Sequence, residues 1–193
     1  MPTAPASPSA REAELLELAY AWVLEHGLSD LSLRPLAAAI GSSPRVLLFL
    51  FGSKEELVRR ILARARADEL ARLAPADDLR STVLATWAWL ADPTHDGLLR
   101  VWVEAYGRSL VDPAGPWGEL ARATVEDWLA VLAASQPPGV RRTARGRDQR
   151  TAALALLRGA LLDLLATGDR KRVDAGIRAG VAALELPGTV LLS

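Results

Sequence analysis

The sequence predicts an all-α protein in which a three-helix head of the helix-turn-helix type precedes a C-terminal helical bundle, with about nine helices altogether. Apolar residues recur at the spacing of helices, and no segment shows the alternation typical of strands. Three helix-start signals follow one another between Leu31 and Leu57, and turns rich in Pro or Gly divide the rest of the chain.

Length and composition limit the possible classes of protein. The chain has 193 residues, half of them apolar, which suits one large domain or two small ones. It contains no cysteine, which excludes a disulfide framework, a thiolate metal site and a cysteine nucleophile. The N-terminus lacks the apolar stretch of a signal peptide, and no apolar run approaches the length of a membrane span. We therefore expect a cytoplasmic protein with no membrane partner, and the many Ala, Arg, Leu and Gly residues suggest a bacterial source.

The first helix is expected over residues 11–26. Residues 1–10 hold three prolines among Ala and Ser, and we expect them to form a disordered arm. Gly27 is expected to end the helix. Its buried stripe recurs at helical spacing and comprises Leu15, Leu18, Ala19, Trp22 and Val23.

Two short helices are expected within residues 32–51. Ser32 is suited to cap the first, which ends at Gly41, a residue that tolerates the left-handed conformation. Ser43 is suited to cap the second, with Pro44 at the first helical position, where its missing N–H is harmless. Two short helices joined by a tight turn form a helix-turn-helix, whose second helix enters the major groove of DNA.

A third start signal opens the remaining helices. Ser53 and Glu56 have the spacing of a capping box, and the helix is expected to run to about Leu73. Residues 137–147 are expected to form a basic loop, and the tail after Pro187 is expected to fray. The other helices are expected over residues 79–91, 98–111, 117–134, 148–166 and 170–186.

The segment from Ser32 to Leu57 also carries residues in the pattern of one known family. They are Ser32, Leu33, Arg34, Leu36, Ala37, Ile40, Gly41, Ser43, Pro44, Leu47, Phe51 and the run Gly52-Ser53-Lys54-Glu55-Glu56-Leu57. In these positions the chain resembles the tetracycline-repressor (TetR) family of transcriptional regulators. The resemblance implies a DNA-binding domain over residues 1–53 and a ligand-binding and dimerisation domain over residues 54–193.

Several residues of the head are candidates for contact with double-stranded DNA. Arg45 lies in the first turn of the second short helix, where arginine can make a bidentate contact with guanine. Ser32 and Arg34 are placed for phosphate contacts, and the resemblance implies the same role for Lys54. The full predicted set is Ser32, Arg34, Ser43, Arg45, Val46, Leu48, Leu50 and Lys54.

The centre of this helix departs from the family, which carries a Tyr and then a His or Tyr there. This chain has Leu48, Phe49 and Leu50 between two expected core residues, so at least one of the three must be exposed. An exposed apolar residue could contact thymine methyl groups, meet an unusual packing partner, or mark weakened or lost DNA binding. Residues 1–54 hold four basic and five acidic side chains, so little sequence-independent affinity for DNA is expected.

Five of the six tryptophans follow residue 54 and suggest an apolar or aromatic ligand. Plain core packing is the alternative for any one of them. The predicted ligand-binding residues are Thr86, Trp87, Trp102, Tyr106, Trp117, Thr124 and Trp128.

The last two helices are expected to form a homodimer interface. The helix over 148–166 is apolar around much of its circumference, although packing within one chain is the alternative. The predicted interface residues are Leu157, Leu161, Leu164, Val173, Ile177, Gly180 and Val181.

These observations predict a one-component transcriptional regulator, a repressor that binds a palindromic operator as a dimer and is released by a ligand. The alternative is a dimeric small-molecule-binding or adaptor protein whose degenerate head no longer reads DNA. An enzyme is not expected, because no phosphate loop, paired-histidine metal motif or nucleophile elbow is present in the sequence. No metal or organic cofactor is expected, and the acidic loop around His95 is interpreted as turn chemistry.

Overall fold

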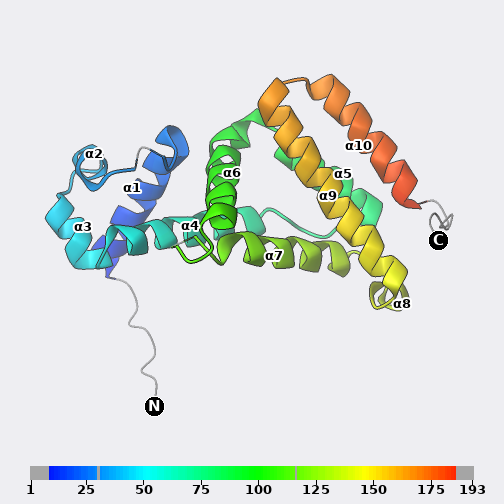
Figure 1. The fold of residues 1–193 in the computed structure, drawn as a ribbon, viewed down its shortest axis with the longest axis horizontal. Helices are drawn as coiled ribbons and strands as arrows, with labels where there is room; N and C mark the ends of the chain where they lie inside the picture. The colour runs from blue at the N-terminus through cyan, green and yellow to red at the C-terminus, as the bar shows by residue number, and fades with distance from the viewer. Residues whose placement is uncertain (1–8, 30, 116, 186–193) are drawn as a thin grey trace, which may run out of the picture. The chain divides into compact units, whose positions relative to one another are not determined.

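The computed structural model describes residues 9–29, 31–115 and 117–185, and all regular structure within them is helical (Figure 1). This confirms the all-α class; the predicted N-terminal arm, apart from its last two residues, and the predicted frayed tail lie outside the described residues. The helices are α1 Ala10–His26, α2 Leu33–Ala39, α3 Pro44–Phe51, α4 Lys54–Leu70, α5 Leu79–Leu90, the 3-10 helix η1 Pro93–His95, α6 Asp96–Val111, α7 Leu120–Ala134, α8 Pro138–Arg141, α9 Ala144–Thr167 and α10 Arg170–Glu185.

Two helix starts differ from the prediction for a local reason. The Ser9 hydroxyl accepts a hydrogen bond from the Glu12 N–H, and the Glu12 side chain returns one to the Ser9 N–H, so α1 begins at a full capping box. The Thr143 hydroxyl accepts from the Gly146 N–H at 3.0 Å and starts α9 inside the expected basic loop. The same loop contains the short helix α8, which follows Pro137.

The chain forms two compact units. The first unit comprises the chain up to Asp68 together with Arg100–Ala121, and the second comprises Glu69–Leu99 and the chain from Arg122 onward. The head therefore shares its unit with most of α4 and most of α6.

In the first unit α1, α2, α3 and α4 bury a common apolar core. Its fully buried side chains include Leu15, Leu36, Leu47 and Ile61. Gly41 has φ +63° just after α2, as predicted, and α2 and α3 are bent by 101° relative to each other, which is the geometry of a helix-turn-helix. Among the described residues no single helix is long and apolar enough to cross a membrane. Only α2 and α3 taken together have the necessary length and apolar composition, and they form a bent pair.

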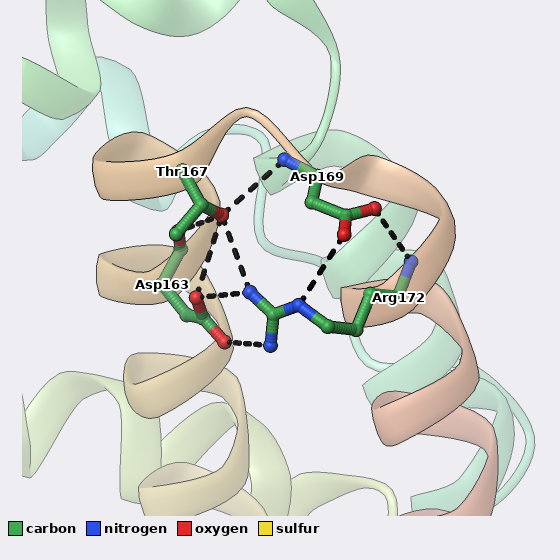
Figure 2. A network of polar contacts seen from close by, with 4 residues as sticks. All are labelled: Asp163, Thr167, Asp169 and Arg172. Carbon is green, nitrogen blue, oxygen red and sulfur yellow. Dashed lines mark hydrogen bonds and ion pairs between the residues drawn. The ribbon is translucent and has the colours of Figure 1, made fainter.

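In the second unit α9 packs against α10 and α5. The turn between α9 and α10 contains Gly168 at φ +67°. Figure 2 shows Arg172 of α10 reaching both carboxylate oxygens of Asp163 on α9, at 2.7 and 2.6 Å. The Asp169 carboxylate accepts from the Arg172 backbone N–H at 3.1 Å and completes the network. The hairpin is thus closed by a bidentate ion pair as well as by its turn.

We expect the Asp163–Arg172 pair to make the protein sensitive to acid. The hydrogen bonds from Arg172 hold the pKa of Asp163 below its ordinary value of 3.8. A carboxyl group with a lowered folded-state pKa stabilises the fold above its unfolded-state pKa, and the contribution is lost as pH falls through the folded-state value. From about pH 5 to about pH 3, the melting temperature of the wild type should therefore fall more steeply than that of Asp163→Asn.

The matched control is Asp77→Asn, which changes an exposed carboxylate with no ion pair or hydrogen bond among the described residues. Its melting curve should follow the wild type over the same pH range. Parallel curves for Asp163→Asn and the wild type would show that the pair contributes no acid-sensitive stability.

Candidate nucleic-acid interface

The helix α3 turns one side to the core and the other to solvent. Leu47 and Phe51 are 1% and 3% exposed, which confirms them as core residues. At its start the Ser43 hydroxyl accepts a hydrogen bond from the Val46 N–H at 3.2 Å, as predicted for an N-cap. Arg45 projects from the first turn into solvent. The core contacts of α3 therefore leave its N-terminal turn and outer side free for a ligand.

The cationic candidates lie in a stretch without acids. Residues 31–54 contain three basic side chains and no acidic one. The three are Arg34, Arg45 and Lys54; each is exposed, and none has an ion pair or side-chain hydrogen bond to another described residue. Ser32 precedes α2 in an extended conformation, and its hydroxyl is likewise not used as a cap. These groups remain available for phosphate oxygens.

Two of the four acidic residues of α1 pair with arginines of α4. Glu12 pairs with Arg60, and Glu17 accepts from Arg64 at 2.7 Å. The hydrogen bond to Glu17 raises the pKa of Arg64, so this guanidinium keeps its charge. The acidic composition of residues 1–54 therefore does not describe the charge around α3, because these carboxylates have cationic partners that lie later in the sequence.

An apolar surface surrounds Arg45 on α3. Phe49 is 84% exposed, and Val46 and Leu48 are 39% and 42% exposed, whereas Leu50 is half-buried. The prediction that at least one of the three central residues is exposed is confirmed. Phe49 is absent from the predicted DNA-binding set, although its position opposite Leu47 and Phe51 follows from helical spacing of 100° per residue.

Comparison with known proteins identifies the family of this head. Residues 15–61 match the bacterial regulatory proteins of the tetR family. Over these residues the chain is similar to the TetR family. The matched stretch runs from α1 into α4 and includes the whole helix-turn-helix. The family assignment agrees with the resemblance seen in the sequence.

Solved structures share the fold of this chain. A transcriptional regulator from Rhodococcus sp. Rha1 is 19% identical, with a TM-score of 0.74 over 90% of this chain and 95% of that chain. A TetR-like transcriptional regulator from Rhodococcus sp. RHA1 is 21% identical, with a TM-score of 0.59 over 93% of this chain and 96% of that chain. The similarity extends the shared fold beyond the head. No curated protein matches the chain.

Within the first unit α6 holds the loop that follows α1. The Glu104 carboxylate accepts from the Leu28 N–H at 2.9 Å and from the Ser29 hydroxyl. It also pairs with Arg108 at 3.0 Å, one turn further along α6. The Arg108 guanidinium lies over the Trp117 ring at 5.2 Å. The head is thus attached to α6 by hydrogen bonds to its backbone and side chains.

The structure divides the predicted ligand-binding residues between the two units. Trp102, Tyr106 and Trp117 lie in the first unit, where the Trp102 and Tyr106 rings contact each other at 5.0 Å. The other four, Thr86, Trp87, Thr124 and Trp128, are all buried in the second unit.

The two tryptophans of the second unit have structural partners. The Trp87 indole N–H donates to Asp174 at 2.7 Å, and the Trp128 indole N–H donates to Glu69 at 2.7 Å. Both rings are packed in the core, as expected from the packing alternative.

A cavity of about 260 Å³ lies in the second unit, and it uses none of the predicted ligand-binding residues. The Gln136 side chain at its edge is buried and held in place, because it donates to the Gly146 carbonyl at 2.9 Å and accepts from Arg150 at 3.1 Å. The cavity is lined by Asp78, Leu79, Arg80, Gln136, Pro137, Val140, Gln149, Val181 and Leu184.

Most of the predicted dimer residues are buried within one chain. Leu157, Leu161, Val173, Ile177 and Val181 are at most 4% exposed. They pack inside the α9–α10 pair, so they have no surface left to offer a second copy. Leu164 is half-buried.

The remaining predicted interface residue, Gly180, is also engaged within the chain. A Cβ atom at Gly180 would lie 2.7 Å from the Leu156 side chain, so this glycine lets α9 and α10 approach closely. A bulky substitution at Gly180 would therefore disturb the hairpin itself and would not report on dimerisation alone.

Proposed function

We propose that this TetR-family transcriptional regulator is a repressor that binds a palindromic DNA operator as a homodimer. The observation that carries the proposal is the solvent-exposed side of α3, which presents Arg45 in a stretch without acidic residues. Arg45 reads a guanine in the major groove, while Ser32, Arg34 and Lys54 contact phosphates. Ser43 is engaged as the N-cap of α3 and serves mainly to hold the helix start.

Selection of bound sequences from random duplex DNA tests this proposal. Low salt is required, because few cations face the DNA and affinity falls as salt rises. We expect an enriched palindrome whose half-sites lie about 10 base pairs apart, since the two recognition helices of a dimer enter successive major grooves. Absence of any sequence preference at low salt would overturn the repressor proposal and favour the adaptor alternative.

A surface other than the predicted one supports the homodimer. The outer side of α9 and α10 exposes many small residues, with the larger Arg178 of α10 among them. Its largest apolar residue is Leu162, at 50% exposure, and neither Gly159 nor Gly176 has a neighbour within 4 Å of an added Cβ atom. The other exposed apolar residues are Ala152, Ala155, Ala166, Ala175, Ala179, Ala182 and Ala183.

Release by a small apolar or aromatic ligand completes the proposal. The cavity of about 260 Å³ in the second unit supports it, because apolar walls with a few polar groups are typical of ligand sites. The ligand acts by favouring a conformation of the dimer that does not fit the operator. A compound that raises the melting temperature of the protein should also release the selected operator.

A further inference from the structure

The outer side of α3 has one hydrogen-bonding residue and a broad apolar remainder. Arg45 is the only residue of Pro44–Phe51 with a polar side chain. Phe49 follows it by four residues and therefore lies on the same side of the helix, one turn further on. With 84% of its surface exposed, Phe49 presents nearly the whole ring to solvent. Val46 lies beside both and is 39% exposed.

The electrostatic surroundings favour a polyanion over an apolar protein as the partner of this surface. The exposed cations Arg34, Arg45 and Lys54 belong to the same segment, and residues 31–54 contribute no carboxylate. A protein partner for an apolar patch gains nothing from three nearby unpaired cations, whereas a DNA duplex presents phosphates on both sides of the groove. The occupant of this surface is therefore DNA.

Within the major groove the apolar group that a base pair presents is the C5 methyl of thymine. An apolar side chain at a groove-facing position thus distinguishes thymine from the other bases. Arg45 and Phe49 are separated by about 6 Å along the helix axis, from a rise of 1.5 Å per residue. Base pairs are stacked about 3.4 Å apart, so the two side chains reach bases about two pairs apart.

We propose that Phe49, with Val46 beside it, reads a thymine methyl about two base pairs from the guanine contacted by Arg45. The inference rests on the proposed function and specifies the operator of that same site. It gives the recognition helix two kinds of readout, a hydrogen-bonded one at its start and an apolar one at its centre.

The test uses the full chain and the operator obtained by selection. Each thymine of a half-site is replaced singly, on both halves, by deoxyuridine, which differs from thymine only by the methyl group. For the wild type, deoxyuridine at one of these positions should weaken binding about fourfold per half-site. This is the value expected for loss of one buried methyl. Phe49→Ala should bind the thymine and uracil operators almost equally, because the main partner of the methyl is gone and only Val46 is left beside it.

Two further variants separate the possible outcomes. Arg45→Ala should retain the thymine preference and lose the guanine preference about two base pairs away. The matched control is Val111→Ala, which truncates an apolar side chain of α6 that is 86% exposed, and it should behave as the wild type. Because Phe49 is exposed, Phe49→Ala should keep the wild-type melting temperature.

Each result decides a different point. If the wild type reads an operator but Phe49→Ala keeps the full thymine preference, the inference is overturned and the proposed function stands. If the wild type has no sequence preference, the proposed function itself fails. If Phe49→Ala leaves DNA binding unchanged and instead abolishes self-association, the apolar side of α3 is a protein contact and the inference is overturned.

Discussion

Trp128→Ala is expected to lower the free energy of unfolding by about 3–5 kcal/mol, the usual cost of deleting a buried aromatic ring. The ring is 2% exposed, and its indole N–H donates at 2.7 Å to Glu69, which is itself 4% exposed. Truncation therefore leaves a cavity and removes a donor from a buried carboxylate. Chemical denaturation of the wild type and the variant measures the difference.

Trp128→Phe separates the hydrogen bond from the ring, since phenylalanine keeps an aromatic side chain without the N–H. It should cost about 1–3 kcal/mol. The matched control is Trp89→Phe, because the buried Trp89 indole N–H has no hydrogen-bond partner among the described residues. The control should be close to neutral. If the two Phe variants lose the same free energy of unfolding, the hydrogen bond to Glu69 contributes nothing beyond the effect of the smaller ring.

Arg45→Ala and Lys54→Ala should weaken DNA binding in different ways. Arg45→Ala is expected to cost about 1–3 kcal/mol on the best operator and to relax the preference for one base pair per half-site, because a bidentate guanine contact is lost. Lys54→Ala should weaken all sequences about equally and lower the salt slope by about one unit per half-site, because only a phosphate contact is lost. Titrations at several salt concentrations, on the operator and on scrambled DNA, measure both effects.

The control for both is Arg100→Ala, which removes an exposed arginine of α6 and should leave affinity and salt slope unchanged. If Arg45→Ala weakens every sequence alike, Arg45 contacts the DNA backbone and the guanine assignment is wrong.

Features that depend on neighbouring residues could be predicted from the sequence. Ser43 and Ser53 cap their helices as expected, since the hydroxyl and the N–H that it accepts from lie three residues apart. Gly41 adopts the left-handed conformation for an equally local reason. Ser32 marks the start of α2 correctly, but its hydroxyl makes no cap hydrogen bond.

Features that depend on distant contacts could not be predicted. A helical pattern shows that one side of α9 is apolar, but it does not show whether α10 or a second chain covers that side. The sequence therefore predicts Leu157 and Leu161 at a dimer interface, whereas the structure buries both side chains within one chain. Likewise, the donor–acceptor pair of Trp128 and Glu69 spans 59 residues, so no local signal connects the two.

The bond between Glu104 and the Leu28 N–H has a consequence for hydrogen exchange. An amide held by a part-buried carboxylate of another helix exchanges with solvent only when that hydrogen bond opens. The exchange rate of the Leu28 amide therefore measures how often the loop after α1 separates from α6. A single backbone proton thus reports the attachment of the DNA-binding head, without any label on the DNA or on a ligand.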